Sequence, residues 1–113
     1  MATNEAQLVG EITKDILKSY PTSWVFKVVG GPYQMVGVPD ILVCVYGLLI
    51  GIEVKHQKPG ESEQGARERT TATQRAQIAR INRAGGIAGT ALSSQEALDI
   101  IERGLKHRMK EWR

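Results

Sequence analysis

The segment GVPDILVCVYGLLIGIEVK, residues 37–55, constrains the fold more than any other part of the chain. It is rich in Val, Ile and Leu, which favour strands, and Gly47 interrupts it where a tight turn would join two strands into a hairpin. The pattern predicts strands over 41–46 and 48–55. Both are apolar on both faces near their middles, so we expect helices to cover the sheet on either side, as in an α/β layer fold.

The rest of the chain completes the order α-β-β-β-α-β-α. Asn4 followed by Gln7 predicts a helix over about 4–19, which Pro21 ends, with an apolar residue recurring every fourth position. Polar and Gly-rich residues over 57–71 show no periodicity and predict an exposed, mobile loop. The other predicted elements are a strand over 24–29, a loop over 30–37, a helix from 71 to 84, a strand over 87–92 and a final helix over 94–113.

Length and composition narrow the class of protein. The 113 residues suffice for one compact domain over 1–113, and 42% hydrophobic with 24% charged residues is ordinary for a soluble chain. A single cysteine, Cys44, excludes an intramolecular disulfide. The first 20 residues lack a basic start followed by an apolar block, and the longest apolar run, 41–52, is shorter than the ~20 residues of a membrane span. We therefore predict an intracellular protein that is not secreted, with no membrane partner and no nucleotide cofactor.

Two acids and a lysine occur within the predicted hairpin. Side chains alternate along a strand, so Glu53 and Lys55 share a face, and the turn at Gly47 returns Asp40 to the end of the partner strand. Two carboxylates this close repel each other unless a cation lies between them, and their oxygens suit a hard ion such as Mg²⁺. The alternative is a surface Glu–Lys pair beside an aspartate that caps a turn. Pro39 fixes the entry to the strand and places Asp40 at its edge.

These residues carry a resemblance to a known family. GVPD at 37–40 and IEVK at 52–55 resemble the motifs of PD-(D/E)xK nucleases, in particular those of the small, stand-alone VRR-Nuc (virus-type replication-repair nuclease) domains common in phages. Thr71-x-x-Gln74, the segment 84–86 and Lys27 are also similar to that family. The resemblance spans roughly residues 5–101. It implies a restriction-endonuclease-like core, a central mixed sheet of about four strands flanked by helices.

The resemblance also implies roles for individual residues. Asp40 and Glu53 would bind Mg²⁺, for which Mn²⁺ would substitute, helped by the backbone carbonyl of Val54. Lys55 would assist the attacking water. Gln74 matches a family position near the active site, although Thr71-x-x-Gln74 is also a capping box in which Gln74 serves only the helix start.

The family's first helix usually adds an acid to the same site. Glu5 precedes three apolar residues of this helix by 3, 7 and 11 positions, which predicts that it lies on the inward stripe. Glu11 is turned by roughly 120° from that stripe, so we expect Glu5 to be the metal ligand. The alternative is that Glu5 only complements the helix dipole in the first turn.

Positive charge gathers in two places. Residues 67–83 carry five arginines against one acid, and the last eight residues are also basic. Such patches attract phosphate backbones, although a solvated helix face has the same composition. The residues that we expect to contact DNA are Lys27, Lys58, Arg67, Arg69 and Arg75.

The resemblance implies a Mg²⁺-dependent DNA endonuclease, structure-specific for branched DNA such as Holliday junctions or flaps, working in the cytoplasm or nucleoid of a bacterial host. A homodimer would present two sites to two strands. The stripe on the last helix is either its interface or part of the core; it comprises Leu98, Ile101, Leu105, Met109 and Trp112. The alternatives are a catalytically inactive DNA-binding or assembly module on the same fold, and a small regulator in which the E-x-K match is accidental.

Overall fold

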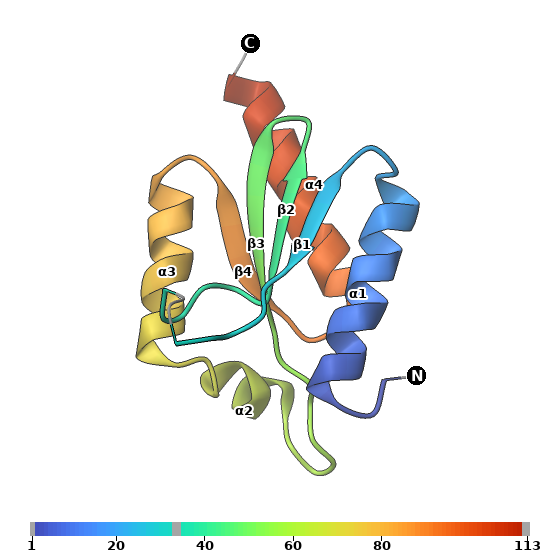
Figure 1. The fold of residues 1–113 in the computed structure, drawn as a ribbon, viewed down its shortest axis with the longest axis vertical. Helices are drawn as coiled ribbons and strands as arrows, with labels where there is room; N and C mark the ends of the chain where they lie inside the picture. Colours follow the sequence, from blue (N-terminus) through green and yellow to red (C-terminus); the bar gives the residue numbers. More distant parts are fainter. Residues whose placement is uncertain (1, 33–34, 112–113) are drawn as a thin grey trace.

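The computed structural model describes residues 2–32 and 35–111. Its four strands form one mixed sheet in the order β1-β2-β3-β4, in which β3 and β4 are parallel and the other neighbours antiparallel (Figure 1). This confirms the predicted sheet. The elements are α1 (Glu5–Ser19), β1 (Trp24–Lys27), β2 (Ile41–Val45), β3 (Leu48–Val54), α2 (Glu63–Glu68), α3 (Ala72–Arg83), β4 (Ile87–Ala91) and α4 (Ser94–Glu111).

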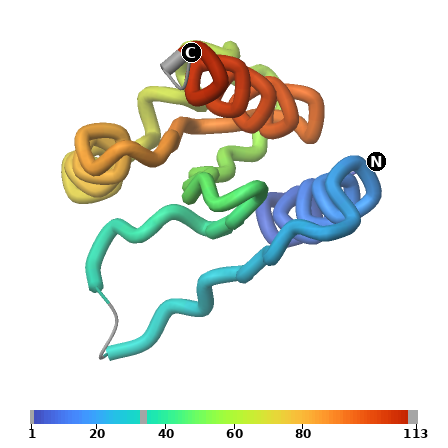
Figure 2. Tube along the Cα trace, turned by 90° about the horizontal axis from the view of Figure 1, so that it is seen from above, coloured from blue at the N-terminus to red at the C-terminus, as the bar shows by residue number. Residues whose placement is uncertain are grey.

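Helices cover the two faces of the sheet unequally. One face packs against α1 and α4, and the main hydrophobic core lies there, with Ile12, Ile16, Ile52 and Ile101 all fully buried. The other face is covered by α3, whose Ile81 lies over Gly51 of β3 and Gly86 beside β4. Figure 2 shows α3 alone on its side of the sheet. The prediction of helices on both sides is therefore right for β3 and β4, which lie under α3.

Local signals in the sequence set the element boundaries. The Asn4 side chain accepts a hydrogen bond from the Gln7 backbone N–H, which caps α1 at its predicted start. The hairpin turns at Tyr46 and Gly47, whose φ angles are 50° and 77°. Two successive residues in the left-handed region make the two-residue turn that fits the twist of a hairpin, and Gly47 adopts it without steric cost.

The segment 57–71 is more ordered than we predicted, because it contains α2. Ser62 caps this helix by accepting a hydrogen bond from the Gly65 N–H, and Ala66 is fully buried. Arg69 then ties the helix end to the preceding loop through Glu61 and through the carbonyl oxygen of His56. The loop prediction was therefore wrong over this helix. A six-residue helix that buries only one alanine shows no apolar periodicity in the sequence, so the pattern could not reveal it.

The apolar stripe on α4 belongs to the core. Ala97, Ile100 and Ile101 are buried, and Leu98 and Leu105 pack against them. Over these residues the stripe is therefore part of the core. Met109 is 59% exposed, and the predicted contribution of Trp112 lies outside the described residues. Within the described part of the chain, no helix combines the length and apolar character needed to cross a membrane.

Candidate active site

Asp40 is fixed at the ends of the two central strands. Its carbonyl oxygen accepts a hydrogen bond from the Val28 N–H at 2.8 Å, which extends the pairing of β1 with β2. Its side-chain Oδ2 accepts from the backbone N–H of Val54 at 2.8 Å, across on β3. Pro39 immediately before it is fully buried. Asp40 is thus held against the end of β3, as the hairpin predicted.

Glu53 and Lys55 form a buried pair beside Asp40. The side chains are 1% and 8% exposed, and Lys55 Nζ lies 3.3 Å from Glu53 Oε2. This burial excludes the alternative of a surface Glu–Lys pair. Removing two charges from water costs several kcal/mol per ion. The attraction between Glu53 and Lys55 alone therefore does not explain why the chain buries this pair.

The charge on Glu53 is poorly compensated. Burial and, after it, the negative charge of Asp40 together raise the pKa of Glu53 to about 7, because Lys55 only partly opposes them. In addition, the Oε1 atom of Glu53 is buried and has no hydrogen-bond partner among the described residues. A buried acceptor without a partner costs roughly 1–3 kcal/mol, and more when it is charged. A further positive charge next to the carboxylates of Asp40 and Glu53 would therefore stabilise the site.

The donor set fits a hard divalent ion. Asp40 and Glu53 supply two carboxylates, and the unpartnered Oε1 of Glu53 is a free oxygen for coordination. Over residues 2–32 and 35–111, no three His, Cys, Asp or Glu side chains gather as a metal cluster. Two protein carboxylates are enough for Mg²⁺, which keeps several of its waters. An ion here would also offset the repulsion that raises the pKa of Glu53.

Gln74 makes contacts that fit both of the interpretations that the sequence left open. Its Oε1 accepts a hydrogen bond from the Thr71 backbone N–H at 2.9 Å and completes the capping box of α3. The same oxygen lies 3.3 Å from Lys55 Nζ, which donates to it. The ammonium of Lys55 is therefore held between Glu53 and Gln74, and the start of α3 is one wall of the site.

The loop that carries Asp40 docks on the first turn of α3. Gly37 has a φ of 83°, and a Cβ at this position would lie 2.5 Å from the carbonyl oxygen of Thr73. Only glycine permits both the left-handed backbone and this close approach. Gly37 thereby couples the position of Asp40 to that of Gln74. In the sequence, the glycine of the GVPD motif marks this contact between the loop and α3.

Glu5 does not lie where we predicted. It is exposed in the first turn of α1, in a hollow that His56, Lys58 and Arg69 also line. The buried residues of α1 begin only at Leu8. Glu5 has the helical spacing of this inward stripe, but it lies one turn before the part of the helix that packs against the protein. Glu11 is exposed as well. Neither acid forms a three-residue cluster with Asp40 and Glu53, and the helix-dipole interpretation fits the position of Glu5.

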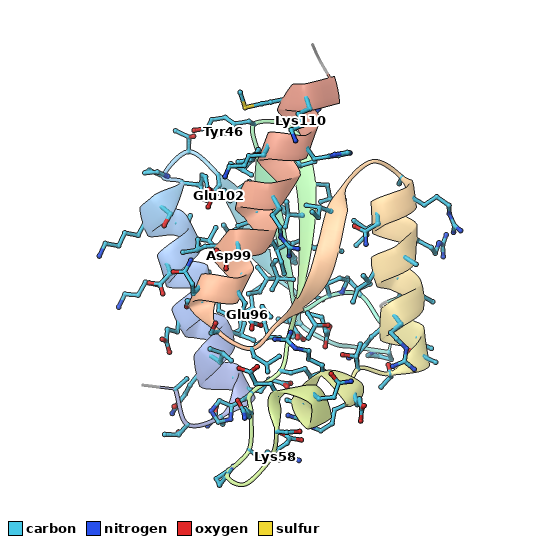
Figure 3. The ribbon with its side chains drawn as sticks, turned by 180° about the vertical axis from the view of Figure 1, so that it is seen from behind. Tyr46, Lys58, Glu96, Asp99, Glu102 and Lys110 are labelled. Carbon is cyan, nitrogen blue, oxygen red and sulfur yellow. The ribbon has the colours of Figure 1, made fainter. Side chains whose placement is uncertain are left out.

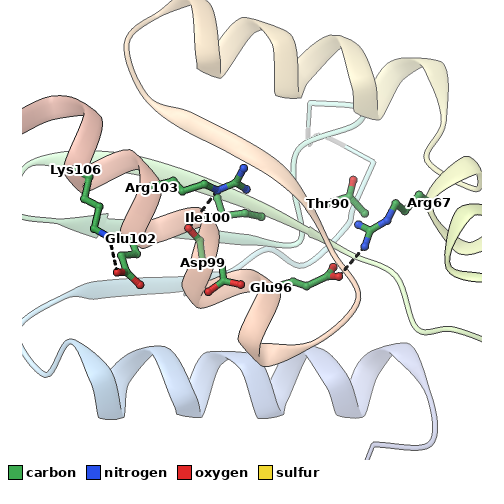
Figure 4. A pocket seen from close by; sticks show the side chains of 8 residues that line it. All are labelled: Arg67, Thr90, Glu96, Asp99, Ile100, Glu102, Arg103 and Lys106. Atoms are coloured by element: carbon green, nitrogen blue, oxygen red, sulfur yellow. Dashed lines mark hydrogen bonds and ion pairs between the residues drawn. The ribbon is translucent and has the colours of Figure 1, made fainter. Parts of the chain in front are cut away.

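Two of the three predicted DNA-contacting arginines form ion pairs within the chain. Arg67 pairs with Glu96 at 2.6 Å in a hollow along α4 that Asp99 and Glu102 also line; Figure 3 places these acids along α4, and Figure 4 shows the pair. Arg69 pairs with Glu61 at 2.9 Å, and this hydrogen bond lowers the pKa of Glu61 to about 2.

The remaining basic candidates differ in exposure and position. The Arg75 guanidinium donates to the Thr70 carbonyl. Lys27, at the end of β1, and Lys58, in the loop between β3 and α2, are exposed (Figure 3 labels Lys58). The acid-lined surroundings of Arg67 suit a phosphate poorly, whereas Lys58 extends into solvent.

Sequence reasoning missed one polar residue that supports the site. Thr70 is only 5% exposed, and its hydroxyl lies 3.4 Å from that of Thr90 on β4. It anchors the chain just before the capping box of α3. No signal in the polar segment 57–71 distinguishes it from its exposed neighbours.

Comparison with known proteins supports the fold. A solved structure described as "VRR_NUC domain" superimposes with a TM-score of 0.58 and 22% sequence identity, over 89% of this chain and 97% of that one. No family model and no curated protein matches the sequence. The chain thus has a VRR-Nuc-like, restriction-endonuclease-like fold. At this identity the likeness shows the fold alone, so activity must be argued from the site.

Proposed function

We propose that this chain is a metal-dependent DNA endonuclease that hydrolyses phosphodiester bonds. The observation that carries the proposal is the buried Glu53–Lys55 pair beside Asp40, in which one oxygen of Glu53 has no partner among the described residues. A chain that needed this pair only for stability would do better with apolar residues of similar volume. Buried carboxylates with a raised pKa next to a lysine are typical of catalytic sites.

Each residue of the site has a role in this mechanism. Asp40 and Glu53 would hold Mg²⁺, or Mn²⁺ in its place, with the backbone carbonyl of Val54 as a further ligand. The bound ion would polarise a phosphoryl oxygen and lower the pKa of a water molecule. Lys55 would orient the attacking water and stabilise the charge that develops on the phosphate. Gln74 would keep the Lys55 ammonium in position through the hydrogen bond to Nζ.

DNA would be held mainly through its backbone. Lys27 and Lys58 are exposed and would contact phosphates, which positions DNA without reading its sequence. Arg69 and Arg75 would join them from the loop and helix that flank the site. The preference for branched DNA, such as Holliday junctions or flaps, rests on the resemblance of the GVPD and IEVK motifs to those of VRR-Nuc domains.

The test compares DNA structures with and without metal. Purified protein is incubated with a labelled four-way junction, a flap, a matched duplex and single-stranded DNA, each in Mg²⁺, in Mn²⁺ and in EDTA. We expect cutting in either metal, none in EDTA, and faster cutting of a branched substrate than of the duplex. Asp40→Asn should bind DNA but not cut it, because it loses a ligand of the ion.

The control variant is Glu63→Gln, which removes an exposed carboxylate in the first turn of α2 and leaves Asp40, Glu53 and Lys55 unchanged. It should cut like the unaltered chain. If no substrate is cut while DNA is still bound, the alternative of a catalytically inactive DNA-binding or assembly module replaces this proposal.

A further inference from the structure

Each polar group of Thr70 has a partner in a different element of the fold. Its backbone N–H donates to the carbonyl oxygen of Arg67 in α2 at 3.1 Å, and its carbonyl oxygen accepts from the Arg75 guanidinium of α3. Its hydroxyl lies 3.4 Å from the hydroxyl of Thr90 on β4. Because Thr70 is only 5% exposed, these groups depend on their protein partners. Thr70 therefore joins α2, α3 and the sheet.

Thr90 is the neighbour of Glu53 across the sheet. The parallel register of β3 and β4 pairs these two residues, and paired strands lie roughly 4.7–4.9 Å apart. Ala88, two residues before Thr90, lies against Gly51 on the face that α3 covers, so Thr90 belongs to that face as well. The hydroxyl of Thr70 therefore contacts the sheet directly beside the carboxylate that we propose as a metal ligand.

These contacts close a ring that contains Lys55. The Lys55 backbone N–H donates to the carbonyl oxygen of Ala91 on β4 at 3.1 Å, and Lys55 Nζ donates to Gln74 Oε1 at 3.3 Å. The same Gln74 oxygen accepts from the N–H of Thr71, which directly follows Thr70 in the chain. One end of Lys55 is thus bound to β4 directly, and the other end reaches β4 through the hydroxyl of Thr70.

We propose that the hydroxyl pair of Thr70 and Thr90 is a positioning device of the active site, which holds the Lys55 ammonium in a fixed place beside Glu53. Neither threonine is a catalytic residue, because both act on Lys55 through Gln74. The role rests on the proposed nuclease function, in which Lys55 orients the attacking water. Packing alone would not require these hydroxyls, because valine has a similar shape and avoids the cost of burying a polar group.

Cleavage is sensitive to the position of such an ammonium group. A displacement of about 1 Å in a group that acts on the reacting atoms can lower the rate by roughly 100-fold. Lys55 has a flexible stem, so its ammonium stays in one place only while both of its partners do. Glu53 is part of the central strand β3, whereas Gln74 lies in the first turn of α3, after the polar segment 57–71. The hydroxyl pair fixes the second partner relative to the first.

Valine substitutions separate positioning from stability. Thr90→Val leaves the buried hydroxyl of Thr70 without a partner and should lower the stability, whereas Thr70→Val combined with Thr90→Val removes both hydroxyls and should unfold nearly like the unaltered protein. We expect this double variant to bind DNA with unchanged affinity and to cleave it roughly 10- to 100-fold more slowly in single turnover at saturating DNA. A purely structural role would instead restore the cleavage rate together with the stability.

Two control variants match these substitutions. Thr70→Ser keeps the hydroxyl and should restore most of the cleavage rate. Thr13→Val removes a part-buried threonine hydroxyl from α1, where it donates to the carbonyl oxygen of Val9 at 2.8 Å and has no contact with the ring around Lys55. This variant should cleave like the unaltered protein, because it undergoes the same chemical change outside the ring.

NMR of the Lys55 ammonium group follows its position without any cleavage. In metal-free protein, the Lys55 signal should shift in the double valine variant and stay unchanged in Thr13→Val. An unchanged Lys55 signal in the double variant overturns the inference, and so does a cleavage rate that recovers with the stability. If none of the proteins cuts DNA, the proposed nuclease function fails, and the Lys55 signal still decides whether the hydroxyl pair holds the ammonium in place.

Discussion

Glu53→Gln should make the metal-free protein more stable while abolishing cleavage. Because the pKa of Glu53 is raised from 4.5 to about 7, the folded chain holds a proton that the unfolded chain releases between these pH values. Stability should therefore fall as pH rises through this window, and the loss is complete above it. A shift of this size corresponds to about 3 kcal/mol at ~1.4 kcal/mol per unit. Glutamine mimics the protonated side chain and avoids that loss.

Urea unfolding in EDTA measures this directly. At about pH 8 the free energy of unfolding of Glu53→Gln should exceed that of the unaltered protein by about 2–3 kcal/mol, and near pH 4.5 the two should coincide. Glu61→Gln is the control of opposite sign, because the hydrogen bond from Arg69 lowers the pKa of Glu61 to about 2; it should not stabilise at either pH. If Glu53→Gln destabilises the protein equally at both pH values, the carboxylate has a structural role and the reasoning fails.

Three further substitutions test the architecture of the site. Gly37→Ala should lower the free energy of unfolding by more than about 2 kcal/mol, since it adds a clash to the cost of a left-handed backbone. Gly60 has a similar φ of 78° but open space around it, so Gly60→Ala should cost only about 1 kcal/mol. Thermal unfolding of the two variants measures this difference. Gln74→Ala and Thr71→Ala both disrupt the capping box and should each cost about 1 kcal/mol, but only Gln74→Ala should slow cleavage at saturating substrate, because only Gln74 contacts Lys55. Equal cleavage rates in these two variants would reduce Gln74 to a capping residue. Lys58→Ala should weaken DNA binding equally for all sequences and reduce the salt dependence by about one counterion; fluorescence anisotropy at several salt concentrations would show an unchanged slope if Lys58 makes no phosphate contact.

Periodicity and turn chemistry predicted most of the fold. The apolar spacing and Asn4 cap gave α1, and the strand run around Gly47 gave the central hairpin with its turn. The convergence of Asp40 with Glu53 followed from the hairpin alone, because the register of an antiparallel pair fixes which residues face each other. These are local signals, and local signals are what a single sequence carries best.

Features that depend on tertiary packing were not predictable in this way. The spacing of Glu5 matches the inward stripe of α1, but whether that stripe is covered at its first turn depends on where the sheet ends. Helix α2 was missed because its only buried residue is Ala66. The apolar pattern of the strands predicted helices on both faces, yet α3 reaches only β3 and β4, and this difference leaves Trp24 and Leu49 uncovered.

The most direct test of the central claim is the single-turnover cleavage of a labelled four-way junction. The unaltered protein and Asp40→Asn are compared in Mg²⁺, with protein in excess so that both bind all of the DNA, and EDTA serves as the blank. The proposal predicts cutting by the unaltered protein in Mg²⁺ alone and none by Asp40→Asn at equal DNA occupancy. Cutting that persists in EDTA or in Asp40→Asn would contradict the assignment of Asp40 and Glu53 as the metal site of a nuclease.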